Sequence, residues 1–495
     1  MKNKNTFLNN KVQDCLIAIF AMIITFTLFS CSKPTSGKIP ITTNSEKALE
    51  YFNEGIALSQ KLRGQEAVYF YLKAIAEDKD FAMAYMQLAM AQTTPKLTFK
   101  YFNKAKSLSK KVSEGERLTI LAIEARINND REKENDYYLE LIEKFPNDEM
   151  VHNTYGNFLY GLRKYKGAIK HLKIALEINP ELSHPYNMLG YSYRQLGDYD
   201  EAEKYFKQYI DLIPDDPNPY DSYAELLLKK GEFEESIEYY RRALEIQPNF
   251  FASIIGISTN LTLLDRHKEA CKELERIESL SDDPGDLKRM HYAKAVVNVD
   301  RSNFDRAIEE INANVKISQE INDDIAIGND LINLGVLNLM SGKYDDALKY
   351  YEKSIEYFER SDISQDLKYY VRRQLFVNAS YVAYLRNDIK TLNMYKEKYE
   401  TSAKKTMNLN ELRNVHALAG LAYLLEKNYA DAIFELKQAD QEDTVLLYFI
   451  GTAYEELGDY KKAQKIYESV AHFNSLNDLN YAYIRKTALE KLAEF

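Results

Sequence analysis

Apolar and polar residues alternate with a helical period along most of the chain, in short segments separated by turn residues. The stretch MLGYSYRQLGDYDEAEKYFKQYIDLIP, residues 188–214, carries one apolar stripe before Gly197 and another after it. This pattern predicts two amphipathic helices joined by a tight turn. A similar sequence, AYEELGDYKKAQKIY, recurs at residues 453–467. Repetition of one helical hairpin predicts an elongated, all-α array.

Small residues recur at a fixed spacing across each predicted hairpin. A small residue in the first helix is followed, twelve residues later, by another in the second helix. Where two antiparallel helices cross, small residues let the axes approach to about 8 Å, whereas larger side chains would separate them. The residues assigned to these crossings include Gly55, Ala67, Gly156, Ala168, Gly190, Ala202, Ala224, Gly335, Ala347, Gly420, Ala432, Gly451 and Ala463. Tyr101 and Glu134 occupy the second position in two units and break the pattern.

Glycine and proline mark the ends of the predicted helices. Between the two helices of a hairpin, a glycine can adopt the left-handed conformation that ends a helix. After the second helix, a proline cannot continue it. The turn glycines are Gly197, Gly231, Gly342 and Gly458, and the prolines are Pro146, Pro180, Pro214 and Pro248, at intervals of 34 residues.

The hairpin pattern resembles the tetratricopeptide repeat, with a tyrosine in place of the family's usual tryptophan. The residues that carry the resemblance are Tyr186, Leu189, Gly190, Tyr193, Ala202, Phe206 and Pro214. The resemblance extends over most of residues 46–475 and implies an α-α superhelix, for which we expect twelve hairpins. Stacked hairpins bury their faces against their neighbours, so the array depends on every member.

The spacing of the repeats predicts two segments. Residues 46–284 form the regular segment, much of it in strict 34-residue register. In residues 285–476 the spacing rises to 40 or more in several steps, which predicts longer, degenerate repeats. We expect SDDPGD, residues 281–286, to interrupt or hinge the array. Residues 477–495 predict a terminal helix that caps the last stacking face.

The resemblance also implies a binding groove on the concave face, which the first helices of the hairpins form. The residues at the corresponding positions are Asn153, Asn157, His184, Asn187, Tyr191, Arg194, Asp221 and Glu225. Amides can bond to an extended peptide backbone, and tyrosine can stack on a side chain or a sugar. The other interpretation is that these residues are solvated polar positions with no partner.

The first thirty residues predict an export signal. Three lysines precede the apolar run at residues 15–30, which is shorter than the roughly 20 residues of a membrane-spanning helix. LFSC, residues 28–31, resembles the lipobox of bacterial lipoproteins, which implies cleavage before Cys31 and acylation of that residue. The alternative is an uncleaved N-terminal anchor. Residues 31–45, rich in Ser, Thr and Pro, predict a flexible tether between lipid and folded body.

Composition and motifs disfavour several functional classes. The 495 residues carry a formal net charge of −10, which disfavours nucleic-acid binding because phosphate contacts need clustered Lys and Arg. The sequence contains none of the common catalytic, phosphate-binding or metal-binding motifs, and its seven histidines are scattered. We therefore expect no catalytic residue, no cofactor and no metal. Besides Cys15 and Cys31 only Cys271 is left, so no internal disulfide is expected after export.

Together these patterns predict a non-catalytic scaffold that lipid on Cys31 anchors to the bacterial outer membrane, facing the periplasm. Its partner would be a protein or peptide of the envelope, in secretion, assembly or transport. One alternative is a glycan-binding outer-membrane lipoprotein of a nutrient-uptake system, which the lack of tryptophan and of long insertions disfavours. Another is a degenerate enzyme within residues 286–495, which the continuous helical pattern disfavours.

Overall fold

The computed structural model describes residues 37–61, 63–404, 409–475 and 477–495. Over these residues the regular structure is helical, with no β-strand, so the predicted all-α fold is confirmed. The export signal at residues 1–30, Cys31 and the first part of the tether lie outside the described residues.

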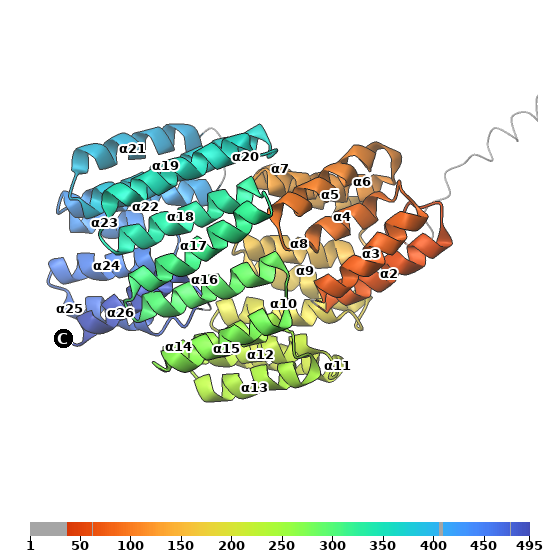
Figure 1. Ribbon diagram of the computed structural model, residues 1–495, viewed down its shortest axis with the longest axis horizontal. Helices are drawn as coiled ribbons and strands as arrows, with labels where there is room; N and C mark the ends of the chain where they lie inside the picture. The colour runs from red at the N-terminus through yellow and green to blue at the C-terminus, as the bar shows by residue number, and fades with distance from the viewer. Residues whose placement is uncertain (1–36, 62, 405–408, 476) are drawn as a thin grey trace, which may run out of the picture.

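Twelve antiparallel helical hairpins follow one another along the described chain, as predicted (Figure 1). We call the first seven hairpins the first segment. They pair α2 (Glu46–Gln60) with α3 (Gly64–Glu77), α4 (Ala82–Met90) with α5 (Pro95–Leu108), α6 (Glu114–Ile127) with α7 (Arg131–Lys144), α8 (Glu149–Gly161) with α9 (Tyr165–Ile178), α10 (Ser183–Gln195) with α11 (Tyr199–Leu212), α12 (Pro217–Lys230) with α13 (Phe233–Ile246), and α14 (Phe251–Leu263) with α15 (His267–Leu280). A short 3₁₀ helix, η1 (Ser109–Lys111), follows α5.

The remaining five hairpins and a final helix form the second segment. They are α16 (Pro284–Asp300) with α17 (Phe304–Glu320), α18 (Asp324–Met340) with α19 (Tyr344–Arg360), α20 (Gln365–Leu385) with α21 (Ile389–Ala403), α22 (Leu409–Leu425) with α23 (Tyr429–Leu436), α24 (Thr444–Glu456) with α25 (Tyr460–Ala471), and α26 (Leu479–Leu492). Helices α16 to α19 have 17 residues each and α20 has 21, against 13 or 14 in α8 and α9. The longer helices explain the wider spacing of the repeats in this segment.

Small residues allow the close helix crossings that the sequence predicts. A Cβ atom built on Gly55, Gly190, Gly335 or Gly451 would lie 2.3–2.6 Å from a ring carbon of the side chain sixteen residues later. These aromatic side chains are Tyr71, Phe206, Tyr351 and Tyr467, all buried. The ring of the second helix therefore fills the space that the glycine leaves, and this keeps the hairpin tight.

Glu134 shows how the hairpin tolerates a departure from the small-residue pattern. Its side chain is fully buried at the predicted crossing. Arg126 Nε and Arg131 Nη1 each lie 2.7 Å from its carboxylate oxygens. A buried carboxylate is tolerated when it is paired and hydrogen-bonded, so two guanidinium groups here replace the usual alanine contact.

The turns inside the hairpins use left-handed backbone, as predicted. Gly197, Gly231, Gly342 and Gly458 have φ between 76° and 82°. The sequence did not predict that other residues adopt the same conformation at equivalent turns. These residues are Asn129, Arg163, Asp265, Ser302, Asn387 and Lys427, with φ between 56° and 60°.

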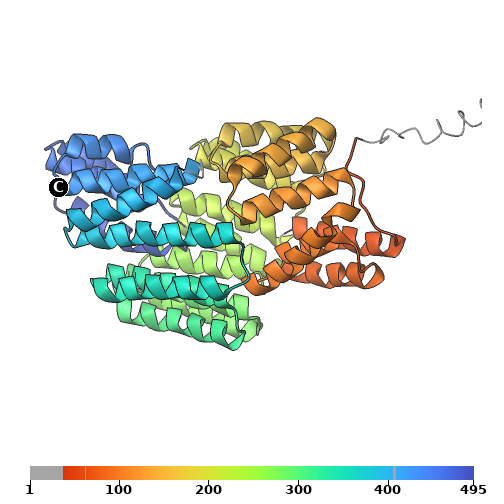
Figure 2. The same cartoon turned by 90° about the horizontal axis from the view of Figure 1, so that it is seen from above.

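The array continues across residues 281–286 and then folds back on itself. Ile277 of α15 and Met290 of α16 lie in one apolar cluster, and Asp283 caps α16 through the backbone of Gly285 and Asp286. The expected interruption is therefore a short connection within a continuous core. The second segment lies beside the first (Figures 1 and 2). For example, the backbone N–H of Lys96 donates to the Asp323 carboxylate over 2.9 Å.

Residues 38–45, which we expected to belong to a flexible tether, are held against the third and fourth hairpins. The backbone N–H of Ile39 donates to Asp148 over 2.8 Å, and that of Thr42 donates to the buried Glu116 over 2.9 Å. Lys38 pairs with Glu149 at 2.6 Å. The expectation of a free tether is wrong for these residues, because buried carboxylates satisfy their backbone donors. We call residues 38–45 the strap.

Candidate functional site

The predicted groove residues lie in one row across α8, α10 and α12. The structure brings them together, but it pairs them with each other and with the next helix. His184 Nδ1 is 3.0 Å from Asn153 Oδ1, and Arg194 Nη1 is 3.2 Å from Glu225 Oε2. Ser253 of α14 donates to Asp221 over 2.6 Å. The row is therefore a set of contacts between successive repeats.

Burial also distinguishes this row from an open groove. Asn153, Asn187 and Asp221 each expose 5% or less of their surface. Burial lowers the pKa of His184 to about 4. Burial, with the charge of Glu225, raises the pKa of Asp221 to about 8. Near neutral pH both groups are uncharged, so the buried part of the row is polar but close to neutral.

Some polar atoms of the row lack partners. Asn157 Oδ1, Asn187 Oδ1 and Arg194 Nε are buried without a hydrogen bond. Tyr191 donates from its hydroxyl group to Ser222 over 3.3 Å, and burial raises its pKa. Unpaired buried donors and acceptors are uncommon in folded proteins, so these three atoms are exceptions in a row where most residues have a hydrogen-bonded partner.

The second segment covers the end of the row. Arg163, in the turn after α8, forms an ion pair with Asp440. Lys229, at the end of α12, donates to the backbone carbonyl of Phe473. A cavity of about 280 Å³ is left between the two segments. The chain's own residues therefore take the place that we expected a peptide to take at this end of the concave face, because the superhelix turns back on itself.

An open groove lies elsewhere, at a place that no sequence pattern predicted. Its volume is about 850 Å³. One wall is the turn of the first hairpin, residues 63–66, and the other wall is formed by the connections that precede α12, α14 and α16. We call it the inter-hairpin groove. No pattern within one repeat predicts this site, since its two walls come from hairpins that are distant in sequence.

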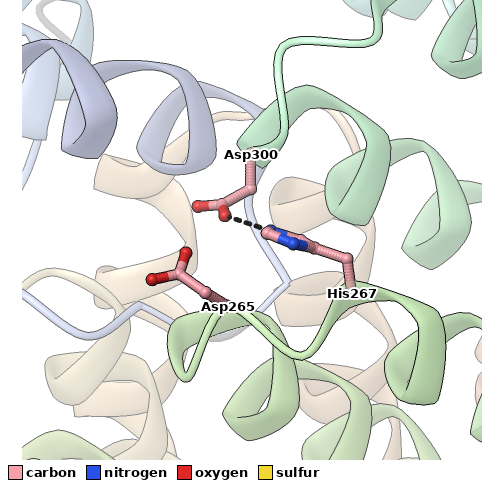
Figure 3. Close-up of side chains that lie close together, drawn as sticks. All are labelled: Asp265, His267 and Asp300. Atoms are coloured by element: carbon pink, nitrogen blue, oxygen red, sulfur yellow. Dashed lines mark hydrogen bonds and ion pairs between the residues drawn. The ribbon is translucent and has the colours of Figure 1, made fainter.

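Asp265, His267 and Asp300 form a compact group with ligand atoms within 4.8 Å of one another (Figure 3). His267 Nε2 is 2.8 Å from Asp300 Oδ2, and Arg485 of α26 lies 3.1 Å from the other oxygen of Asp300. Arg485 also donates to the Leu263 carbonyl. A guanidinium group this close opposes a cation, so the geometry fits a junction between α15, α16 and α26 better than a metal site.

A second histidine contact was also not expected from the sequence. His152 Nδ1 lies 3.1 Å from His171 Nδ1, and His152 Nε2 lies 3.0 Å from the Pro146 carbonyl. A carbonyl only accepts, so Nε2 of His152 carries the proton, and its Nδ1 accepts from His171. Burial and the proximity of His152 lower the pKa of His171 to about 4.

Family models agree with the repeat architecture. Models described as tetratricopeptide repeat match residues 148–215, 181–249 and 287–360, and a further one matches residues 445–471. Over these residues, less than half of the chain, the sequence matches tetratricopeptide repeats. Such repeats generally form non-catalytic scaffolds that bind protein or peptide partners. No curated protein matches the sequence.

Several solved structures are similar to this chain. A tetratricopeptide repeat protein from Parabacteroides merdae ATCC 43184 is 17% identical, with a TM-score of 0.35, over 58% of this chain and 98% of that one. YrrB, described as having an unusual peptide-binding site, is 19% identical, with a TM-score of 0.25, over 37% and 92%. Pseudomonas aeruginosa pilF is 21% identical, with a TM-score of 0.25, over 48% and 92%.

No helix within the described residues is long and apolar enough to cross a bilayer.

Proposed function

We propose that this chain is a non-catalytic scaffold of the bacterial envelope, which a lipid on Cys31 anchors to the outer membrane and which binds a protein partner in the periplasm. The tetratricopeptide repeats support the scaffold role. The lipobox-like LFSC sequence supports the anchor. The observation that carries partner binding is the inter-hairpin groove, since it is open and large.

The inter-hairpin groove has an apolar rim. Ile246 and Leu280 expose 39% and 42% of their surface there, and Phe251 also lines the groove. These residues stand at the ends of α13 and α15 and at the start of α14. Exposed apolar side chains beside polar groups are typical of a surface that binds another protein.

The charges of the groove identify the kind of segment that fits it. Arg63 pairs with Glu66 at one wall, and Arg289 lies 3.4 Å from Asp286 at the other. Asp215 and Asp283 line the groove without an ion pair among the described residues. The groove therefore has a surplus of negative charge, and we propose that it binds an extended segment of a partner that combines Lys or Arg with apolar residues.

Fluorescence anisotropy with labelled peptides tests the groove. A peptide of alternating Lys and Leu should bind, whereas one of alternating Glu and Leu should not. The change Asp215→Lys should weaken binding, and so should Leu280→Asp. Asp200→Lys, at an exposed acidic residue of α11, is the matched control and should bind as the unchanged protein does. Equal affinity for both peptides would contradict the proposal that the negative charge of the groove selects a basic segment.

Membrane attachment is tested separately, in cells. The unchanged chain should incorporate a clickable palmitate analogue and fractionate with outer membranes, and Cys31→Ala should abolish the label. Protease added to intact cells should leave the body uncut if it faces the periplasm. Unlabelled protein in the soluble fraction would contradict the anchor. Binding of polysaccharides on an array, without binding of basic peptides, would favour the glycan-binding alternative.

A further inference from the structure

The cavity between the two segments has the size of a small-molecule site. Its volume is about 280 Å³, near the lower end of the range for ligand pockets. The first segment contributes Arg194, Glu225 and Lys229, and the second contributes Glu442 and residues 473–475. Its walls therefore come from both segments, which meet here because the second segment lies beside the first.

The charged groups of this cavity are paired with one exception. Glu225 pairs with Arg194 at 3.2 Å, and Glu442 pairs with Arg163 at 3.3 Å. The ammonium group of Lys229 donates to the Phe473 carbonyl and lies 3.5 Å above the centre of the Phe473 ring. Among the described residues no carboxylate lies within ion-pair distance of Lys229. Of the described lining residues, Lys229 is therefore the one cation that no ion pair uses, whereas Arg163 pairs with both Glu442 and Asp440.

A second cationic side chain lines the same cavity. Arg194 lines the cavity, and its Nε is buried without an acceptor. Burial and the charge of Arg194 lower the pKa of Lys229 to about 8, although Glu442 raises it somewhat. Lys229 is thus still mostly protonated at neutral pH, in a place where its charge is poorly compensated. An anion that enters would compensate the charge of Lys229.

We propose that this cavity binds a small, polar monocarboxylate, whose carboxylate accepts hydrogen bonds from Lys229 and Arg194. The single cation left unpaired in the described lining, Lys229, favours a ligand with one negative charge, and Glu225 and Glu442 disfavour a dianion such as phosphate. Gln195, Asn474 and Ser475 also line the cavity, and they offer amide and hydroxyl groups to hydroxyl groups of the ligand. This site is separate from the inter-hairpin groove and does not depend on a protein partner.

Isothermal titration calorimetry of the purified full chain tests the site, with lactate, gluconate and glucuronate as probes. At least one acid should bind, whereas glucose should not bind and phosphate should bind more weakly. Lys229→Gln should weaken binding about tenfold to hundredfold, the effect of losing one charge-assisted hydrogen bond. Lys230→Gln is the matched control and should leave it unchanged, since Lys230 does not line the cavity and pairs with Glu232 at 3.0 Å.

The pH dependence of the unchanged chain gives a readout that needs no variant. Affinity should fall above about pH 8, because only the protonated Lys229 binds a carboxylate strongly. The proposal is overturned if none of the acids binds at millimolar concentration, if glucose or phosphate binds as well as they do, or if affinity is constant between pH 7 and pH 9.5. Tighter binding of a dipeptide with a free C-terminus than of any free acid would overturn the small-molecule assignment.

Discussion

The guanidinium group of Arg163 forms an ion pair with Asp440, and so joins the turn of the fourth hairpin to the connection before α24. Its Nε atom also lies 3.3 Å from Glu442, whose carboxylate accepts a hydrogen bond from Tyr165. In an ordinary solenoid each repeat contacts only its neighbours. Here, contacts between distant repeats close the array.

Removing the carboxylates of this contact should open the two segments. We expect Asp440→Asn combined with Glu442→Gln to lower the free energy of unfolding by about 1–3 kcal/mol, because Arg163 is left half-buried and unpaired. Urea unfolding measures the loss, and small-angle X-ray scattering should give a larger radius of gyration. Arg266→Gln, in an exposed pair with Glu269, is the control and should change stability by less than about 0.5 kcal/mol.

Gly190→Ala should destabilise the fifth hairpin. The added methyl group would lie 2.6 Å from the Phe206 ring, and overpacking of this kind costs about 1–3 kcal/mol. Gly161→Ala is the control, since nothing lies within 4 Å of its added Cβ and its φ is not left-handed. Urea denaturation should show a lower midpoint for Gly190→Ala only. Equal midpoints for the two variants would contradict the role assigned to the small residues.

Acid should lower the stability of the fourth and fifth hairpins through His171 and His184. Both have a folded pKa of about 4, below the ordinary value of 6.5, so between these values the unfolded state binds protons that the folded state does not. Each histidine therefore lowers the free energy of unfolding as pH falls from 6.5 to 4, by at most about 1.4 kcal/mol per pH unit and by less for the partly exposed His171. Asp221 acts in the opposite direction, because its folded pKa is raised.

The double variant His171→Gln with His184→Gln isolates this effect from Asp221. Its stability should depend less on pH than that of the unchanged chain over pH 4–6.5, in thermal or urea unfolding at a series of pH values. Parallel curves for the two proteins would show that neither histidine is held in its neutral form.

Glu116→Ala should release the strap. The Glu116 carboxylate accepts from the backbone of Thr42 and of Ser113, and it also completes the capping box of α6. Ser113 still caps the helix, but each lost hydrogen bond to the charged Glu116 carboxylate costs about 1.5–3 kcal/mol. Trypsin should then cut after Lys38 sooner than in the unchanged chain. Glu114→Ala should leave the cleavage rate unchanged, since the exposed Glu114 side chain pairs with Arg117 and does not contact the strap among the described residues.

The hairpins could be predicted because the contacts that form them are local in sequence. The contact of Gly190 with Phe206 and the left-handed turn at Gly231 depend on neighbours within one repeat, and the sequence pattern contains that information. The number of hairpins followed from the same pattern. The sequence did not predict that the strap is held in place, because Glu116 and Asp148, which accept its hydrogen bonds, lie far from it in sequence.

The candidate site was predictable only in part. The row from Asn153 to Glu225 does lie along successive first helices, as family positions imply. Its burial depends on where the second segment lies, and no feature of residues 440–475 indicates that Arg163 or Lys229 is their partner. The wider repeats after Pro284 change the path of the superhelix, and a sequence period does not give that path in three dimensions.

Two of the left-handed turns contain a residue other than glycine whose side chain contacts the second segment. Asn129 and Arg163 occupy turn positions where glycine would relieve backbone strain of roughly 1–2 kcal/mol. Each instead uses its side chain to reach the second segment, at Glu411 and Asp440 respectively. Glycine at either turn would make the hairpin easier to form but would remove a contact between the two segments. A designer who wants an extended, open solenoid from this sequence would therefore begin with those two positions.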